Sequence, residues 1–322
     1  MFDLIIIGGS AAAASAGIYA ARRGLNFKII TKDFGGEVAT SGEVGNYPAI
    51  PDTNGIDLAA KFKEHLKFYN VEPEEGVEVE KIIRQENGTF CIIAKKDGNV
   101  GMAGEKLPDG HPGSKCEYIA KAVIVATGVY PRELNIPGEK EFRNKGVSYC
   151  TVCDGPLFAE KTVAIVGGGN SALESGLMMA ELASRVYMIN KNSAFKGDTI
   201  LLENLKTKQN VEFVYNVKTS GISGEQFVTR LQYKDVDESE KELKVDGVFV
   251  HIGMLPNSGL VPQDVQKNNY GEIIVDKNCQ TNIPGLYAAG DVTDIPFKQI
   301  VLAAAQGTCA LLSAVQYLNK TK

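Results

Sequence analysis

The chain has 322 residues, which is more than one compact core usually holds and suggests about two domains. With 44% hydrophobic residues, 23% charged residues and a net charge of -5, it is typical of a water-soluble protein and has no basic surplus for nucleic acid or an anionic membrane. The N-terminus lacks the basic region of a signal peptide, and no stretch approaches the ~20 apolar residues of a membrane span. We therefore expect a cytoplasmic protein whose partners are proteins or small molecules, with no nucleic acid and no membrane.

The N-terminal sequence FDLIIIGGSAAAASAGIYAARRG predicts a strand, a tight turn and a helix, and NFKII supplies the next strand. An arginine pair followed by Gly24 marks the end of the helix. Such a unit binds a dinucleotide because glycines let the backbone approach the pyrophosphate and the amides of the helix N-terminus attract its charge. The fingerprint is imperfect here. Ser10 and Ala13 replace glycines, and Thr31 or Lys32 stands about where an acid would hold the ribose hydroxyl.

Residues 123–128, VIVATG, predict a further buried strand that ends at a glycine. The segment 95–115 before it is rich in glycine and proline and lies between two strand-like runs. We expect it to form a long, exposed hairpin loop. A partner-specific contact in this loop is left open.

The six cysteines do not suggest a scaffold held by disulfides, because thiols in the cytoplasm are normally kept reduced. We interpret the four that stand singly as small buried apolar side chains, namely Cys91, Cys116, Cys279 and Cys309. Only Cys150 and Cys153, in CTVCDG, form a motif. A zinc site needs four ligands and typically a second close pair, which the sequence lacks, and a structural disulfide over so short a loop gains little stability. The spacing favours a reversible dithiol and no metal site.

The region KTVAIVGGGNSALESGLMMAELASRVYMIN repeats the pattern of strand, glycine turn, helix and strand, with Gly167, Gly169 and Ala172 at the fingerprint positions. Two such units predict two dinucleotides. Near the C-terminus, IPGLYAAGDV predicts a short apolar strand that ends at Gly290 and Asp291. A carboxylate at that place can accept hydrogen bonds from a polyol chain, although a turn with a helix-capping aspartate is the alternative.

The order of the glycine turn, GGE, EVGNYP, ATG, CTVCDG, GGGNSA and AAGDV over residues 8–291 resembles the low-molecular-weight thioredoxin reductase family along nearly the whole chain. The resemblance implies an α/β protein with two Rossmann-like three-layer dinucleotide-binding domains, the second inserted in the first. An FAD-binding domain would comprise residues 1–130 and 253–322. The insert, residues 131–252, would be a nicotinamide-binding-like domain that carries the redox cysteines. The family also implies a homodimer.

The resemblance further implies which residues hold the cofactors. For FAD these are Gly8, Gly9, Ser10, Ala11, Ala12, Ala13, Gly35, Gly36, Glu37, Asn46, Thr127, Gly128, Gly290, Asp291, Lys298, Gln299 and Ile300. For a nicotinamide they are Gly167, Gly169, Asn170, Ser171, Ala172, Lys191 and Lys196. Glu37 stands where the family usually has glutamine, and Lys298 stands where arginine is more usual.

In the family, the flavin reduces the disulfide, and the resemblance assigns Cys153 to the flavin side and Cys150 to attack on the partner's disulfide. Asp154 would carry a proton, with a turn-forming aspartate as the alternative. The implied activity is an FAD-dependent disulfide oxidoreductase that reduces a thioredoxin-like protein while the inserted domain rotates. Two other functions stay open: a flavin-dependent dithiol oxidase that uses oxygen, and a non-enzymatic flavin redox sensor.

The electron donor is where the sequence departs most from the family. A cluster of three arginines grips the extra phosphate of NADPH in the usual reductase, whereas this chain has NKNSAFK, with Lys191 and Lys196 as its cations. No acid stands there to select NADH. We predict weak use of NADPH, with reduced ferredoxin as the leading alternative donor. NADH-linked relatives that supply peroxiredoxins carry a large extra N-terminal region, and the sequence begins at the FAD strand.

Overall fold

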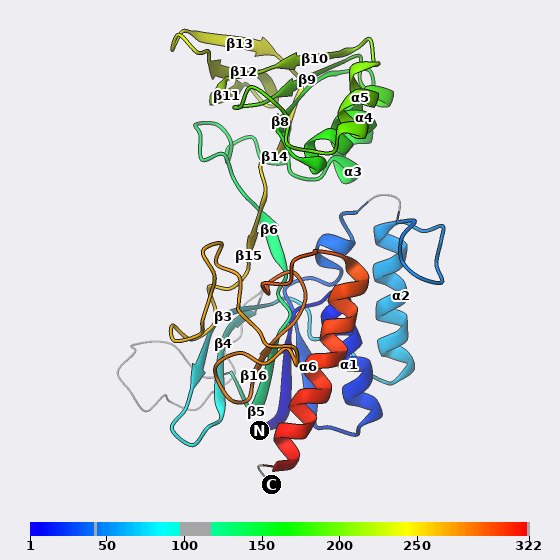
Figure 1. Cartoon of the computed structure of the whole chain (residues 1–322), viewed down its shortest axis with the longest axis vertical. Helices are drawn as coiled ribbons and strands as arrows, with labels where there is room; N and C mark the ends of the chain where they lie inside the picture. The colour runs from blue at the N-terminus through cyan, green and yellow to red at the C-terminus, as the bar shows by residue number, and fades with distance from the viewer. Residues whose placement is uncertain (42–43, 97–116, 321–322) are drawn as a thin grey trace. The chain divides into compact units, whose positions relative to one another are not determined.

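The computed structural model describes residues 1–41, 44–96 and 117–320, so nearly all of the loop expected at 95–115 lies outside the described residues. The chain forms two compact units. Unit 1 comprises Met1–Tyr130 and Leu255–Lys322, and unit 2 comprises Pro131–Met254. The chain passes from one unit to the other within two short paired strands, β6 (Val129–Pro131) and β15 (Met254–Pro256) (Figure 1).

Unit 1 is built on a six-stranded sheet in which β1 pairs in parallel with β2 and β5, and β5 pairs in parallel with β16. Strands β3 and β4 extend the sheet in antiparallel fashion. The strands are β1 (Phe2–Ile7), β2 (Phe27–Ile30), β3 (Val77–Arg84), β4 (Phe90–Lys96), β5 (Tyr118–Val125) and β16 (Leu286–Ala288). Leu4 and Ile6 face one hydrophobic core while Ile5 and Ile7 face another, so β1 is covered on both sides.

The helices of unit 1 are α1 (Ala11–Arg22), α2 (Gly55–Phe68), α6 (Ile300–Lys320) and the short 3₁₀ helix η1 (Gly36–Val38). Figure 1 shows α6 beside α1. The two helices approach so closely that a Cβ on Gly307 would lie 2.0 Å from the carbonyl oxygen of Ala12. The predicted first unit is confirmed, because α1 ends before Gly24 and the φ of that glycine is +64°.

Helix α6 corrects one expectation from the sequence. With 21 residues it is long and apolar enough, by length and composition alone, to cross a membrane, whereas no such stretch was expected. One stripe of α6 is buried, at Ala304, Gly307, Ala310, Leu311, Ala314 and Leu318. Three of these residues, Ala310, Leu311 and Ala314, share a core with Ala12, Ala13 and Ala16 of α1, so this stripe of small residues packs closely against α1, while only 22% of the apolar window is buried.

Unit 2 has three layers around a five-stranded, all-parallel sheet ordered β10-β9-β8-β14-β7. Its strands are β7 (Val147–Ser148), β8 (Thr162–Gly167), β9 (Arg185–Ile189), β10 (Val211–Val214) and β14 (Gly247–His251). Val163 and Ile165 of β8 pack in a core with helix α4 (Asn170–Leu182). Ala164 and Val166 face the opposite core, which a second sheet covers. The predicted order of strand, glycine turn, helix and strand is confirmed.

The second sheet of unit 2 is antiparallel and consists of β11 (Lys218–Gly224), β12 (Val228–Lys234) and β13 (Glu240–Lys244). The remaining helices are α3 (Thr151–Asp154), the 3₁₀ helix η2 (Gly155–Phe158) and α5 (Thr199–Lys206). Of these elements, α3 and η2 carry the cysteine motif. They lie immediately after β7, at the carboxyl end of a parallel strand, where open α/β sheets usually place their functional groups.

A polar cluster around Glu74 ties the loop before β3 to the sheet of unit 1. The carboxylate forms ion pairs with Lys28 and with Lys96, both at 2.6 Å, while the Glu74 amide donates to the carbonyl of Ile29 at 2.9 Å. Desolvation of the carboxyl group opposes ionisation. The hydrogen bonds from Lys28, Lys96 and Tyr118 outweigh it and lower the pKa of Glu74 to about 2.

We expect Glu74→Gln to lower the free energy of unfolding by about 1 kcal/mol at pH 7, since part of the charge pairing is screened by solvent. The pKa is lowered in the folded state, so this stability is present above pH 4.5 and is lost as the pH falls towards 2. Thermal unfolding followed by circular dichroism at pH 7 and pH 3 should show the difference between wild type and variant shrinking at the lower pH. Glu75→Gln, which removes a single exposed pair with Lys63, is the matched control. An equal loss in both variants would contradict this expectation.

Candidate active site

The cysteine motif of unit 2 begins just after β7 and continues through the single helical turn of α3. Cys150 lies at this turn and is disulfide-bonded. The side chain of Cys153 lies outside the described part of the chain, so its pairing with Cys150 stays a prediction from the sequence. Two apolar side chains near the turn are open to solvent, with Val152 38% and Leu157 68% exposed. The motif is therefore presented at the surface of unit 2.

Ser148 holds the two ends of this turn together. Its hydroxyl donates to the Asp154 carboxylate at 2.6 Å and accepts the amide proton of Cys150 at 3.0 Å. The Asp154 amide closes the turn by donating to the carbonyl of Cys150 at 3.1 Å. The carboxylate is thereby fixed within the motif. Sequence reasoning missed Ser148, although a serine two residues before a cysteine motif is a usable signal for such a turn.

The glycine turn of unit 2 lies at the end of β8. A Cβ on Gly167 would lie 2.2 Å from the carbonyl oxygen of His251, so strand packing itself requires this glycine. A Cβ on Gly169, in contrast, would enter open space, and α4 begins there without a side-chain cap. The open N-terminus of α4 therefore fits an approaching anionic group. Ser171 is exposed in the first turn of this helix, whereas Ala172 is buried in the core.

The loop after β9 is ordered by its asparagines. Asn190 is buried, donates to the carbonyl of Ala194 at 2.9 Å and accepts the amide proton of Asn192 at 3.0 Å. Asn170 accepts the amide proton of Asp198 at 2.7 Å and donates to the Asp198 carboxylate at 3.0 Å. Both side chains thus hold the loop in place through these hydrogen bonds.

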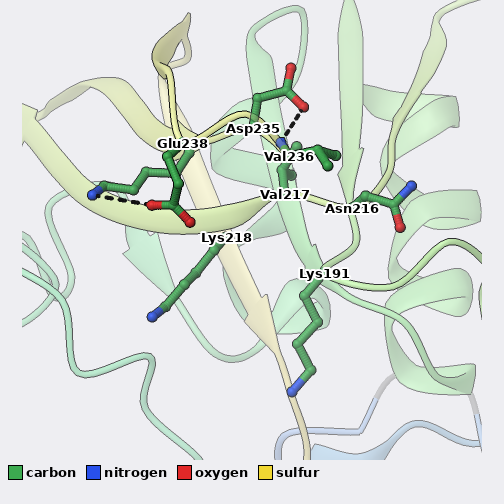
Figure 2. Close-up of a pocket in the computed structure, with 8 residues that line it drawn as sticks. Lys191, Asn216, Val217, Lys218, Asp235, Val236 and Glu238 are labelled. Atoms are coloured by element: carbon green, nitrogen blue, oxygen red, sulfur yellow. Dashed lines mark hydrogen bonds and ion pairs between the residues drawn. The ribbon is translucent and has the colours of Figure 1, made fainter.

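A pocket of about 340 Å³ lies beside Lys191, following the carboxyl ends of β9 and β10 (Figure 2). Its lining residues are Lys191, Asn216, Val217, Lys218, Lys234, Asp235, Val236 and Glu238. Lys234 is paired with Glu238 at 3.7 Å, which leaves Lys191 and Lys218 as the lining cations without an ion pair among the described residues. Lys196 does not line the pocket, and its amide instead donates to the carbonyl of Gly168 at 2.7 Å.

The glycine turn of unit 1 repeats the same packing. A Cβ on Gly8 would lie 2.1 Å from the carbonyl oxygen of Ala126, and one on Gly9 would lie 2.5 Å from that of Asp33. Helix α1 starts after Ser10 with no side-chain cap and no acid in its first turn, so its first amides suit a pyrophosphate. The alanines that follow this serine, Ala11, Ala12 and Ala13, are buried. Thr31 is also buried, and its hydroxyl donates to the carbonyl of Asp33 at 2.6 Å.

Carboxylates gather beside this turn. Burial raises the pKa of Asp291, and Lys298 partly opposes the shift. Desolvation also raises the pKa of Glu37, a hydrogen bond from Thr40 lowers it, and the charges of Asp291 and Asp33 raise it further. Among the described residues nothing donates a hydrogen bond to the Asp291 side chain. A desolvated carboxylate of this kind fits a ligand with hydroxyl groups, such as the predicted polyol chain.

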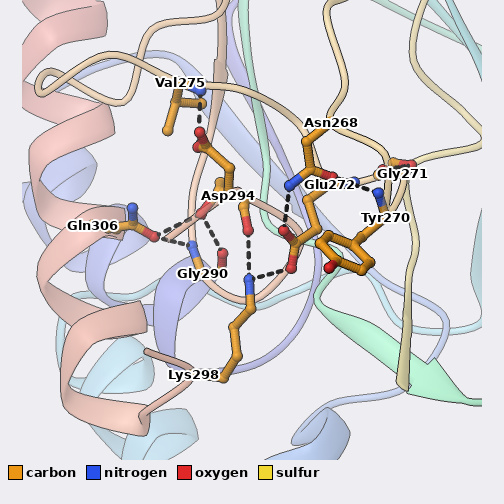
Figure 3. Close-up of polar contacts among 11 residues, drawn as sticks. Asn268, Tyr270, Gly271, Glu272, Val275, Gly290, Asp294, Lys298 and Gln306 are labelled. Carbon is orange, nitrogen blue, oxygen red and sulfur yellow. Dashed lines mark hydrogen bonds and ion pairs between the residues drawn. The ribbon is translucent and has the colours of Figure 1, made fainter. Parts of the chain in front are cut away.

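The backbone around Gly290 is held by α6 and by the loop before it (Figure 3). Gly290 has a φ of +78°, and its amide donates to the side chain of Gln306 at 2.8 Å. The ammonium group of Lys298 donates to the carbonyl of Thr293 at 2.6 Å and pairs with Glu272 at 2.8 Å. Sequence reasoning missed Gln306 and Glu272. A glutamine in the first half of the apolar helix α6, directly before Gly307, was the available signal for the first of them.

The remaining predicted FAD positions fall at turns of unit 1. Asn46 donates to the side chain of Gln299 at 3.2 Å, just before Ile300 opens α6. The Thr127 hydroxyl donates to the carbonyl of Asn257 at 2.7 Å, and the Asn257 side chain returns a bond to the carbonyl of Thr127 at 3.0 Å. Three glycines among these positions have a positive φ that favours glycine, namely Gly35 at +115°, Gly36 at +53° and Gly128 at +62°.

The single cysteines require one correction. Cys91 is fully buried as expected, but it is disulfide-bonded, so its interpretation as a simple apolar side chain is wrong. Cys279 and Cys309 are free, but only Cys279 is buried as expected, whereas Cys309 is partly exposed. Burial, together with the neighbouring Cys309, raises the pKa of Cys279 to about 12. Cys116 lies outside the described residues. Within the described ranges no group of three or more His, Cys, Asp or Glu side chains is placed to hold a metal ion.

The sequence and the fold both match known proteins. Residues 2–307 match the family model of the pyridine nucleotide-disulphide oxidoreductases. An alkyl hydroperoxide reductase subunit of Pseudomonas putida is 39% identical over 99% of this chain, and the corresponding subunit of Escherichia coli is 36% identical over all of it. The chain spans 59% of the length of each of these two relatives.

Among solved structures, the thioredoxin reductase of Lactococcus lactis has a TM-score of 0.84 and 28% identity, over 99% of this chain and all of that one. The thioredoxin reductase of T. acidophilum has a TM-score of 0.81 and 34% identity, over 100% of this chain and 99% of that one. A ferredoxin-flavin thioredoxin reductase from Clostridium acetobutylicum has a TM-score of 0.52 and 30% identity, over 99% and 98%.

These matches confirm the expected fold of two nested dinucleotide-binding domains. They extend over both units and include relatives above 30% identity across nearly the full chain. The chain thus belongs to the pyridine nucleotide-disulphide oxidoreductase family, as a flavoprotein disulfide oxidoreductase of the thioredoxin reductase type.

Proposed function

We propose that this chain binds FAD in unit 1 and passes electrons from it, through Cys150 and Cys153, to the disulfide of a thioredoxin-like protein. The observation that carries the proposal is the disulfide-bonded Cys150 in a surface turn that also fixes Asp154. FAD, when bound, would supply the electron pair that reduces this disulfide. The amides at the start of α1 would hold its pyrophosphate, and the Asp291 carboxylate would accept bonds from its polyol chain.

The thiol half of the reaction follows from disulfide exchange. Reduction of the protein disulfide takes up two electrons and two protons. The Cys150 thiolate then attacks one sulfur of the partner's disulfide and forms a mixed disulfide, which Cys153 resolves as it re-forms the protein disulfide and releases the partner as a dithiol. Asp154, held by Ser148, would accept and return the proton at the attacking sulfur.

The acceptor and the donor are further parts of the proposal. The similarity to thioredoxin reductases supports a thioredoxin-like acceptor. The identities of 36 to 39% to alkyl hydroperoxide reductase subunits support a second candidate for the acceptor, namely the redox partner of such an enzyme. For the donor we propose weak use of NADPH, with NADH or reduced ferredoxin as alternatives. The similarity to a ferredoxin-flavin enzyme supports the latter. A homodimer in the cytoplasm completes the proposal.

We expect the purified protein to be yellow and to hold one FAD per chain. Both Cys150→Ser and Cys153→Ser should abolish disulfide reduction while FAD stays bound, because exchange needs an attacking and a resolving thiol. Flavin absorbance and turnover of a thioredoxin-like substrate are the measurements. Cys309→Ser, which changes a free cysteine in unit 1, is the control and should keep its activity. Near-normal turnover in either motif variant would remove the dithiol mechanism, as would a well-folded protein that never takes up flavin.

Asp154→Asn should slow disulfide reduction by something like ~100-fold, since its carboxylate is the proposed proton carrier. Ser148→Ala should have a smaller effect, about tenfold, because it leaves the carboxylate in place but loses its hydrogen bond. Stopped-flow measurement of the thiol half-reaction would show both. The rate of flavin reduction by the same donor is the internal control and should not change. If Asp154→Asn reacts as fast as wild type, the residue only shapes the turn.

Anaerobic titration of the flavin with NADPH, NADH and reduced ferredoxin, in turn, should show poor bleaching by NADPH. The reason is that Lys191 and Lys196 stand where the family has guanidinium groups, and the cations that line the pocket without an ion pair among the described residues, Lys191 and Lys218, are flexible ammonium groups. Lys191→Ala combined with Lys218→Ala should weaken NADPH use further and leave bleaching by ferredoxin unaltered. Full, fast bleaching by micromolar NADPH would overturn this part of the proposal.

A further inference from the structure

A closed triangle of hydrogen-bonding groups lies behind the cysteine motif in unit 2. The Thr151 hydroxyl donates to the Ser175 hydroxyl at 2.8 Å. Nε2 of His251 lies 2.8 Å from each of these two oxygens. Thr151 and Ser175 are buried, with 3% and 7% of their surfaces exposed. None of the three groups has a part in the electron path described above.

Burial lowers the pKa of His251 to about 4, so the imidazole is neutral at neutral pH. In the neutral tautomer that is protonated at Nδ1, Nε2 accepts a hydrogen bond, which completes a chain of donation from Thr151 to Ser175 to His251. An imidazolium would carry a proton on Nε2 and remove that acceptor. The triangle therefore depends on a histidine that does not change its charge in the working range of pH.

The three residues come from three different elements. Thr151 directly follows Cys150 and opens α3, whereas Ser175 lies within α4 and His251 ends β14. Both α4 and β14 are rigid, because each packs in the cores of the parallel sheet. Ser148 already fixes the two ends of the cysteine turn from β7. The triangle holds the middle of the cysteine turn at Thr151, the residue that follows Cys150.

We propose that Thr151, Ser175 and His251 are positioning residues that hold the Cys150 turn in its disulfide geometry and thereby set how easily the disulfide is reduced. This inference rests on the proposed redox role of Cys150. A disulfide needs its two sulfurs at about 2.05 Å, and they must separate on reduction, so the turn has to relax. An anchor that resists this relaxation stabilises the oxidised form. Loss of the anchor should therefore favour the dithiol.

The test measures the fraction of the Cys150 disulfide that is reduced at equilibrium in a glutathione buffer. In this exchange two glutathione thiols become one disulfide, and the protein takes up two electrons and two protons. Thr151→Val keeps the shape of the side chain and loses the hydroxyl. We expect it to shift the equilibrium about tenfold towards the dithiol, equivalent to about 30 mV. Thr151→Ser restores the hydroxyl and should stay within about twofold of wild type. Ser175→Ala removes the hydroxyl that α4 contributes to the triangle, and it should shift the equilibrium in the same direction as Thr151→Val.

Thr281→Val is the matched control, because Thr281 is equally buried but belongs to unit 1. It should lower the thermal stability without moving the thiol equilibrium. The inference is overturned if Thr151→Val and Ser175→Ala both titrate like wild type, or if Thr151→Ser shifts as far as Thr151→Val. A wild-type protein with no titratable disulfide at Cys150 would instead refute the proposed function, so the two failures can be told apart.

Discussion

The absence of one side chain at the end of a strand is the constraint on which both units depend. A Cβ on Gly8 would meet the Ala126 carbonyl at 2.1 Å, and a Cβ on Gly167 would meet the His251 carbonyl at 2.2 Å. In each unit the glycine ends the first strand of a strand-turn-helix segment and faces the end of its parallel neighbour, β5 or β14. Any larger residue would force the strands beyond their usual spacing of about 4.8 Å. With glycine, the helix that follows can begin at the carboxyl edge of the sheet, where its free amides suit an anionic group.

In unit 2 the end of β14 also contacts the cysteine turn. The carbonyl of His251 lies against Gly167, and its imidazole reaches the Thr151 and Ser175 hydroxyls. On its other side β14 pairs with β7, which places Ser148 beside the cysteine turn. The glycine turn after β8 and the cysteine turn after β7 are therefore built on the two strands that flank β14 in one parallel sheet. A disturbance of β14 should reach both of them, whereas a change in the antiparallel sheet of β11 to β13 should leave the cysteine turn in place.

The parts of this arrangement that the sequence predicts are local. Gly8, Gly24 and Gly167 stand in patterns of a few residues whose physical meaning does not depend on distant partners, and the structure confirms the elements they bound. The triangle could not be predicted, because its members are separated by 24, 76 and 100 residues and each is ordinary when taken alone. Lys218 was missed because it comes from a sheet that the sequence did not reveal. Cys91 was interpreted as a reduced, apolar side chain because a reducing compartment was assumed. Its disulfide contradicts that interpretation, whereas its predicted burial is correct.

The two halves of unit 2 differ in how firmly the structure specifies their chemistry. Short hydrogen bonds from β7, α4 and β14 fix the cysteine turn. The pocket beside Lys191, in contrast, presents two ammonium groups on long side chains, while a third lysine is paired with Glu238 and an aspartate also lines the wall. A phosphate with two charges gains most from several fixed donors, and ammonium groups must first be ordered at a cost in entropy. Under the proposed function, the cysteine turn would therefore work with any donor able to reduce the flavin, and the pocket would decide which donor that is.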